Sequence, residues 1–252
     1  MNGISFCITT SGTNDYGVQQ VIDSIRALHI PNYEVIYCGG LTTSIPQSDT
    51  VKHLPFDESA KAHIILHGHP GRWTTRKKNL SVAAARYDIV VVIHDYIVFH
   101  PNWWEEFQAF GTHWDICVHQ CLLSNGVRAD GWRVDRHPML PRWAMVPYDM
   151  EDLVQYMGLQ GNYNVVKRDR WLETPLNEDI LWGEEEEMEW SRRIVPKSHI
   201  RCNPKCIVQY TKPRPDDANH SVDLQTMINN EHIFNMLRAC KMENFKLCRD
   251  PQ

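Results

Sequence analysis

The sequence lacks the signals that identify several large classes of protein. It has no apolar run near the ~20 residues of a membrane-spanning helix, and its N-terminus has neither the basic head nor the apolar stretch of a secretory leader. The Walker loop and the Gly-x-Gly-x-x-Gly, Gly-x-Ser-x-Gly and His-Glu-x-x-His motifs are also missing. These absences argue against kinases, dehydrogenases, hydrolases and zinc proteases, and they predict a protein with no transmembrane segment.

An excess of basic charge is absent too. The formal net charge is -5 at pH 7, whereas nucleic-acid binders normally present a basic face, so we expect no nucleic-acid partner. This balance still permits a local basic pocket for phosphate groups. With 252 residues, 42% of them hydrophobic, the chain is large enough to bury a core of its own. Its size suits one large α/β domain or two small ones.

The cysteines do not form the two tight pairs that are typical of structural zinc. Cys202 and Cys206 are close together, but the other candidate ligands, Cys240 and Cys248, are widely spaced. Three of the eight cysteines lie in expected strands, where a free thiol behaves as a small hydrophobic side chain. Because free thiols favour a reducing compartment, we predict a cytoplasmic protein.

What the sequence does contain is a buried strand followed at once by a polar triplet. Residues 89–93 are all branched and apolar, which is typical of a strand buried on both faces of a parallel sheet. His94, Asp95 and Tyr96 come next. Ligands of open α/β sheets bind outside the carboxyl ends of the strands, so this position favours a functional role for Asp95. The alternative is a polar residue that only ends a core strand.

The first hundred residues alternate between strands and helices. Strands are predicted at 4–9 and 33–37, and an alanine-rich helix precedes the strand at 89–93. Between the first two strands, apolar residues recur at helical spacing: Val18, Val21, Ile22, Ile25 and Leu28. This order implies right-handed crossovers and a parallel sheet. Residues 114–147 are predicted to be irregular strands and loops, and residues 221–240 a closing helix.

Four segments, in this order along the chain, resemble those of GT-A-fold glycosyltransferases and are nearest to the family 2 type. They are Ile8-Thr9-Thr10-Ser11, Thr75-Arg76-Lys77-Lys78-Asn79-Leu80, Ile93-His94-Asp95-Tyr96 and the acidic segment from Trp182 to Trp190. The second is similar to the family's Arg-x-x-Asn stretch and the third to its Asp-x-Asp metal motif. The fourth resembles its Trp-Gly-Gly-Glu-Asp acceptor-side segment. The resemblance covers residues 4–195.

This resemblance implies a mostly parallel, Rossmann-like central sheet flanked by helices, in a single α/β domain at 1–252. Within it we expect a nucleotide-sugar donor half at 1–100, an acceptor half at 101–195 and a C-terminal closing segment at 196–252. The implied enzyme is a glycosyltransferase. It would move a sugar from a nucleotide-diphosphate sugar, by default a UDP-sugar, to a hydroxyl acceptor such as a glycan.

The donor-binding residues that the resemblance implies come from the first three segments: Thr9, Thr10, Ser11, Arg76, Asn79, His94, Asp95 and Tyr96. The diphosphate that leaves in such a reaction gains negative charge, which a divalent cation or fixed basic groups must stabilise. Where the family has Asp-x-Asp, this chain has Asp95 alone.

Two routes to charge stabilisation therefore stay open. In one, Asp95 holds Mn2+ or Mg2+ together with water and substrate phosphates. His220 lies where related enzymes often supply a late histidine ligand, although a surface-loop histidine is the simpler explanation. In the other, Arg76, Lys77 and Lys78 neutralise the diphosphate without a metal. Basic residues in a first helical turn oppose the helix dipole, which favours a functional reason for their placement.

Glutamates occupy four successive positions, Glu184–Glu187, in the fourth segment. Acidic residues complement the dipole in a first helical turn, so a structural role is one explanation. Crowded carboxylates also raise one another's pKa, which suits proton transfer. The resemblance makes Glu187 the candidate base that deprotonates the acceptor hydroxyl in an inverting reaction, with Glu186 as the second candidate.

Further predictions concern contacts with the substrates. The second strand is followed by glycine where the family often carries an aspartate against the base, and Asp57 is the nearest substitute. Trp182, or Trp132, is a candidate platform for a sugar ring. With nine tryptophans in the chain, however, a core or rim role is the simpler explanation for any one of them. Gly161 begins a segment that resembles the acceptor-side strand of this fold.

Two other functions stay open. A sugar nucleotidyltransferase would share the open sheet and the strand-end aspartate. It normally has a glycine-rich, basic loop after the first strand, whereas residues 9–15 contain one glycine and no basic residue. A catalytically inactive nucleotide- or sugar-binding module would explain the lone Asp95 but not the acidic run.

Overall fold

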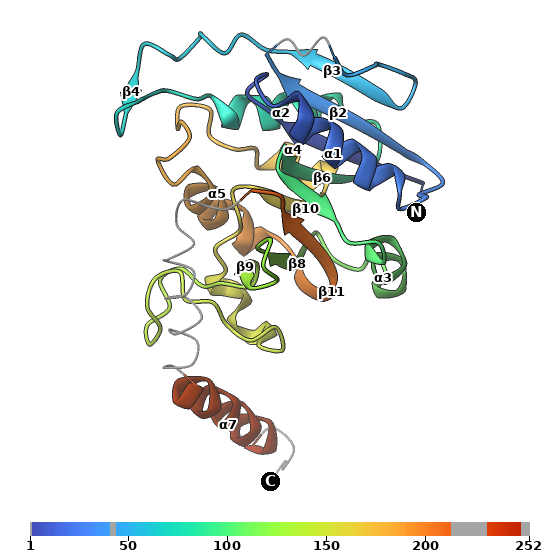
Figure 1. Cartoon of the computed structure of the whole chain (residues 1–252). Coiled ribbons are helices and arrows are strands. Elements are labelled where there is room, and N and C mark those ends of the chain that lie inside the picture. The colour runs from blue at the N-terminus through green and yellow to red at the C-terminus, as the bar shows by residue number, and fades with distance from the viewer. Residues whose placement is uncertain (1, 41–43, 213–230, 248–252) are drawn as a thin grey trace.

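The computed structural model describes residues 2–40, 44–212 and 231–247 (Figure 1). In spatial order, the strands of its central sheet are β3 (Val51–Pro55), β2 (Tyr33–Gly39), β1 (Ile4–Thr9), β6 (Ile89–His94), β10 (Tyr163–Lys167), β8 (Ile116–Leu122), β11 (Ile200–Tyr210) and β7 (Ile97–Phe99), with β9 (Arg128–Asp130) paired to β8. A separate hairpin consists of β4 (Ile65–Leu66) and β5 (His69–Pro70).

Most strands of the central sheet run in one direction. Strands β3, β2, β1 and β6 are parallel neighbours, and β8 and β11 run the same way, while β7, β9 and β10 run opposite to them. The predicted strands at 4–9, 33–37 and 89–93 are all present, and the last two extend slightly further. The predicted fold class, an α/β fold with a mostly parallel, Rossmann-like sheet, is confirmed.

Helices cover both faces of this sheet. On one face, α1 (Asp15–Arg26) and α3 (Trp103–Phe110) enclose a core with the even-numbered residues of β1. Asn14 caps α1 by accepting a hydrogen bond from the Gly17 N–H at 3.3 Å. On the other face, the packing elements are α2 (Thr74–Ala84), α4 (Arg168–Glu173), α5 (Glu186–Ile194) and the 3-10 turns Glu151–Tyr156 and Val195–Lys197.

Two predictions about the second half can be compared with the structure. The segment at 114–147 contains β8 and β9, and β8 is an inner strand of the sheet rather than part of an irregular region. The helix predicted at 221–240 agrees with α7 (Glu231–Leu247) over residues 231–240, and α7 continues to Leu247. Its Phe234 packs into the second core, which helps to hold it on the domain. Residues 213–230 lie outside the described residues.

Two predictions from composition can also be compared with the fold. The described cysteines are free and buried, which fits small hydrophobic side chains: Cys7, Cys38, Cys117, Cys121, Cys202 and Cys206. Burial raises the pKa of the Cys38 thiol to about 11, so it stays protonated at neutral pH. In the part of the chain that the structure describes, no helix has the length and apolar character to cross a bilayer.

Candidate active site

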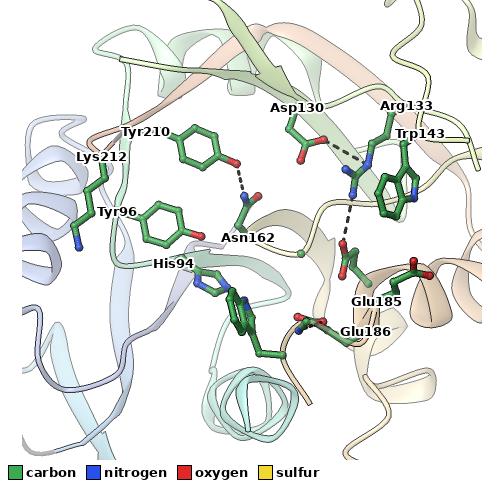
Figure 2. A pocket seen from close by; sticks show the side chains of 14 residues that line it. His94, Tyr96, Asp130, Arg133, Trp143, Asn162, Glu185, Glu186, Tyr210 and Lys212 are labelled. Carbon is green, nitrogen blue, oxygen red and sulfur yellow. Dashed lines mark hydrogen bonds and ion pairs between the residues drawn. The ribbon is translucent and has the colours of Figure 1, made fainter. Parts of the chain in front are cut away.

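Two adjoining cavities open where the parallel strands end. The larger has a volume of about 550 Å³ and the smaller about 130 Å³, and both are lined by His94, Tyr96 and Trp182. The carboxyl ends of β1 and β6 form the floor of the smaller one. The larger lies between β6, the start of β10 and the N-terminus of α5 (Figure 2).

The smaller cavity contains most of the predicted donor residues. Thr9, Thr10, Ser11 and Asp95 all line it, together with His94 and Tyr96. Asp95 is 7% exposed. Its Oδ2 accepts a hydrogen bond of 2.8 Å from the Thr10 hydroxyl, and its backbone carbonyl accepts one of 3.1 Å from the Asn14 side chain. The ends of β1 and β6 are thereby tied together, and the carboxylate is held in one place.

Lys77 is the predicted basic residue that reaches this cavity. Its ammonium donates to the Thr10 carbonyl at 2.8 Å and to both carboxylate oxygens of Glu58 at 2.9 Å. Glu58 also accepts a hydrogen bond of 3.0 Å from the Gly40 N–H. The charge of Lys77 is therefore already neutralised. Asp57, the predicted substitute at the end of β2, instead bonds to Ser59, and it is Glu58 that contacts the end of this strand.

Arg76 and Asn79 lie outside the lining of both cavities. Arg76 forms an ion pair of 2.6 Å with Glu178. The Asn79 amide donates to the Leu176 carbonyl at 2.9 Å and to Glu178 at 3.0 Å. In this arrangement both side chains fasten the loop before α5 to helix α2. Arg76 and Asn79 could contact the donor, as predicted, only if their interactions with Glu178 and Leu176 changed.

Lys78 points from the same helix toward the larger cavity. It is buried, and its ammonium donates to the Gly161 carbonyl, which lines that cavity. Burial lowers the pKa of Lys78, while the nearby Glu186 and Glu187 act against this shift. Glu186 is 5% exposed, and burial raises the pKa of its carboxyl group. Lys78, from the predicted donor half, is therefore close enough to both predicted catalytic glutamates to interact with them electrostatically.

Glu187 is the more accessible of these glutamates and has a second cation beside it. Its Oε1 lies 3.6 Å from a terminal nitrogen of Arg133, and the Arg133 Nε lies 3.5 Å from Asp130 (Figure 2). The Glu187 side chain is 23% exposed. Its Cβ and carboxylate also lie beside Gly161, close enough that a Cβ at this position would be in van der Waals contact with them.

A network of arginines holds the loop at 131–150 against the start of α5. The buried carboxylate of Asp135 accepts hydrogen bonds from Arg142 at 2.9 Å and from Arg192 at 3.0 Å. Burial alone would raise the pKa of Asp135, but these hydrogen bonds outweigh it and lower the pKa. Arg142 also bonds to Glu185, which precedes α5 in the left-handed backbone conformation at φ 60. These ion pairs therefore connect the loop at 131–150 with α5 and with Glu185 before it.

Aromatic side chains form the rim of the larger cavity. Trp182 is 42% exposed and Trp143 is 40% exposed, and both line the cavity. Trp182 keeps its place as a candidate sugar platform. Trp132, in contrast, is fully buried and donates its indole N–H to the Met150 carbonyl at 3.2 Å, so it is a core residue.

The residues around Asp95 offer limited support for a metal ion. Within the described residues, no three His, Cys, Asp or Glu side chains are grouped so that they could bind one by themselves. Asp95 provides one carboxylate, and Mg2+ is often bound by one or two carboxylates with water and substrate phosphates. The donor set fits a cation of that kind. His220, the other predicted ligand, lies outside the described residues.

Known structures with a similar fold place this geometry in context. The chain superposes on S. aureus TarS, a glycosyltransferase, with a TM-score of 0.56 at 12% sequence identity, over 84% of this chain and 37% of TarS. A TarS structure in complex with UDP gives a TM-score of 0.55 at 12% identity, over 82% and 60% of the two chains. One in complex with UDP-GlcNAc gives 0.53 at 14% identity, over 85% and 59%.

The chain has a glycosyltransferase-type fold. It spans 60% or less of the TarS chains compared. No protein-family model and no curated sequence matches it. The likeness to TarS therefore concerns the fold, and the assignment to the family 2 type stays a prediction.

Several residues that line the cavities had no signal in the sequence. Arg72 and Thr74 line the smaller cavity just before the predicted basic segment, and Lys212 lines the larger one after β11. Asp130 and Arg133 lie in a stretch that the sequence predicts to be irregular. None of these residues belongs to a recognisable motif. Each is brought to its cavity by the tertiary fold, which the local sequence does not reveal.

Proposed function

We propose that the protein is a glycosyltransferase that moves a sugar from a nucleotide-diphosphate sugar to a hydroxyl acceptor. One observation carries this proposal: the strand-end triplet 94–96 and the glutamates 186 and 187 contribute to the walls of one connected pair of cavities. These segments are about ninety residues apart in the chain. A donor at the strand ends would thus face a carboxylate that can take a proton from an acceptor.

The donor to test first is a UDP-sugar. TarS, whose fold this chain shares, has been solved with UDP and with UDP-GlcNAc. We propose that Thr9, Thr10 and Ser11 contact the nucleotide. A divalent cation, Mn2+ or Mg2+, would be held by Asp95 and would supply positive charge to the leaving diphosphate.

Glu187 is the proposed general base of an inverting reaction. It lines the larger cavity, and its Oε1 lies 3.6 Å from a guanidinium nitrogen of Arg133. Glu186 is less suited to this role because it is only 5% exposed and its carboxylate already accepts a hydrogen bond of 3.3 Å from the Gly183 N–H. An ionised carboxylate within reach of the acceptor hydroxyl is what such catalysis requires.

The first experiment is a thermal-shift titration with UDP, GDP and CDP, each with and without Mn2+. A ligand that binds only the folded protein raises its melting temperature. We expect a rise with one of the nucleotides, followed by UDP release from a matching UDP-sugar when acceptors are supplied. If no nucleotide changes the melting temperature, the proposed function is wrong.

A catalytically inactive binding module is the second candidate. The single carboxylate at Asp95 favours it, because the family motif has two. It predicts a thermal shift with a nucleotide but no turnover of any nucleotide sugar, even with a broad panel of acceptors. The paired glutamates at the larger cavity argue against it.

A further inference from the structure

The N-terminus of helix α2 lies at the smaller cavity with unsatisfied hydrogen-bonding groups. Trp73 precedes the helix, and no side chain caps the first turn. Thr74 and Thr9, which are 5% and 3% exposed, both line this cavity. Their hydroxyl oxygens are buried and have no hydrogen-bond partner within the described structure. Buried polar groups are normally paired, so two orphans in one cavity point to a missing ligand.

The charges around this cavity favour an anion. A helix N-terminus carries unpaired N–H groups and a partial positive charge, which suits phosphate groups. Arg72 lines the same cavity, and among the described residues it has no acidic partner. Its guanidinium lies 5.0 Å from the centre of the Trp182 ring, which holds it at the junction of the two cavities.

Lys212 provides a second cation, at the larger cavity. It lines the larger cavity next to His94 and Tyr96, and in Figure 2 it lies beside Tyr96. Within the described ranges it also lacks an acidic partner. Lys77, by contrast, is neutralised by Glu58, and Arg76 is paired with Glu178 outside both cavities. Arg72 and Lys212 are therefore better placed than the basic segment to meet a diphosphate.

We propose that the phosphates of the donor bind at the N-terminus of α2, between the side chains of Arg72 and Lys212, with the hydroxyls of Thr9 and Thr74 as donors. The proposal rests on the proposed function, since it assumes a nucleotide-diphosphate ligand. It assigns the diphosphate to side chains that no sequence motif marks. Arg72 also offsets the carboxylate of Asp95, which lines the same cavity and would otherwise repel the phosphates.

The test compares UDP with uridine, which lacks the phosphates. Affinities are measured by calorimetry for the wild type and for Arg72→Gln, Lys212→Gln and Thr74→Val, in the presence of EDTA and again with Mn2+. We expect each charge-removing variant to lose about tenfold in UDP affinity, and Thr74→Val about threefold, with uridine affinity unchanged. The salt dependence of UDP binding should weaken in the charge variants.

Two controls separate charge from structure. Arg86→Gln removes an exposed cation at the opposite end of α2 and should leave both affinities unchanged. Arg72→Lys keeps the charge and should recover most of the UDP affinity. A variant that loses uridine and UDP affinity equally would show that the residue supports the fold, not the phosphates, and would overturn the proposal.

The remaining outcomes are also decisive. Unchanged UDP affinity in both charge variants, or a larger loss from Arg76→Gln than from Arg72→Gln, would overturn the phosphate assignment while leaving the proposed function standing. If the wild-type protein binds neither UDP nor any other nucleoside diphosphate, the proposed function itself fails, and this inference fails with it.

Discussion

The two adjoining cavities differ in whether their key polar groups already have partners within the protein. In the smaller one, the hydroxyls of Thr9 and Thr74 have no partner, and Arg72 faces no acid among the described residues. In the larger one, each catalytic candidate is already beside a cation: Lys78 acts on Glu186, and Arg133 lies against Glu187. The smaller cavity is thus incomplete without a ligand, whereas in the larger one the two candidate glutamates each have a cation of the protein nearby, and Lys212 alone is left for a ligand among the described cations that line it.

This difference predicts that the smaller cavity governs donor affinity and that the larger one governs the chemical step. An incomplete cavity gains most when a ligand supplies the missing hydrogen bonds, so changes there should act on donor affinity. A cavity whose carboxylates have cations nearby influences their protonation states, so changes there should act on turnover and on its pH dependence. Three variants at or near the cavities should test this division, beginning with the largest expected effect, and a fourth should test the arginine network around Asp135.

Glu187→Gln should lower kcat by about 10² to 10⁴-fold, because it removes the proposed base while keeping its size. Donor affinity should stay unchanged, since Glu187 lines the larger cavity and is not among the residues that line the smaller one. Steady-state kinetics and UDP calorimetry measure the two effects. Glu189→Gln is the matched control, because Glu189 lies on the same helix and pairs with Arg193. An equal loss of donor affinity and turnover would assign Glu187 a structural role.

Asp95→Asn should lower turnover by about 10² to 10³-fold and also weaken metal-dependent donor binding. The Thr10 hydroxyl can still donate to the amide oxygen, so the fold should persist. The control is Asp88→Asn, because Asp88 precedes the same strand at its opposite end. Circular dichroism and UDP titration with and without Mn2+ test both parts. A fully active Asp95→Asn variant would contradict a donor-site role for this carboxylate.

Lys78→Met should move the acidic limb of the kcat profile to higher pH. The charged groups facing Glu187 are Lys78 from α2, Arg133 from the loop before β10 and Glu186 from α5. Lys78 lowers the pKa of Glu186 against the effect of burial, so removing this cation should raise the pKa of Glu186 further and its deprotonation should need a higher pH. Lys205→Met, at an exposed lysine, is the control. An unmoved limb would mean that Lys78 has no electrostatic effect on Glu186.

Asp135→Asn should lower the free energy of unfolding by about 1 to 3 kcal/mol at neutral pH, because it weakens hydrogen bonds to two arginines. The pKa of Asp135 is below its ordinary value of 3.8 in the folded protein. The stabilisation is therefore fully present above that value and is lost as the pH falls through the lower, folded-state pKa. Urea unfolding at pH 7 and pH 3 should show a smaller difference at pH 3. A difference that grows at low pH would contradict this.

The donor half was largely predictable because its signals are local. A run of branched apolar residues at 89–93 predicts a buried strand, and the polar triplet after it predicts the place of Asp95. Thr9 and Thr10 were predicted from the resemblance to GT-A-fold glycosyltransferases, and both line the smaller cavity. The ends of the helices and strands were predicted less well, and so was β8. The stretch 114–147 is rich in Trp, Arg and Pro, and its inner strand has polar residues such as His119 and Gln120, which hide the apolar pattern of a buried strand.

The basic segment shows why the rest could not be predicted. Successive residues on a helix point about 100° apart, so Arg76, Lys77 and Lys78 cannot all face one ligand. The fold directs Arg76 to Glu178, Lys77 to Glu58 and Lys78 to Gly161. Which of the three basic residues lies at a cavity depends on the positions of their partners in the folded chain. The sequence of the segment itself does not contain that information.

Local sequence was enough to define the first strands, the helix faces and the chemical types available for a transferase-like site, because hydrophobic periodicity and residue identity act over a few neighbouring positions. The tertiary structure alone decided which charges are paired and which are left facing a cavity. Pairing joins residues such as Lys78 and Gly161 that lie 83 positions apart, and Coulomb and hydrogen-bond energies depend on distances that only the folded chain defines.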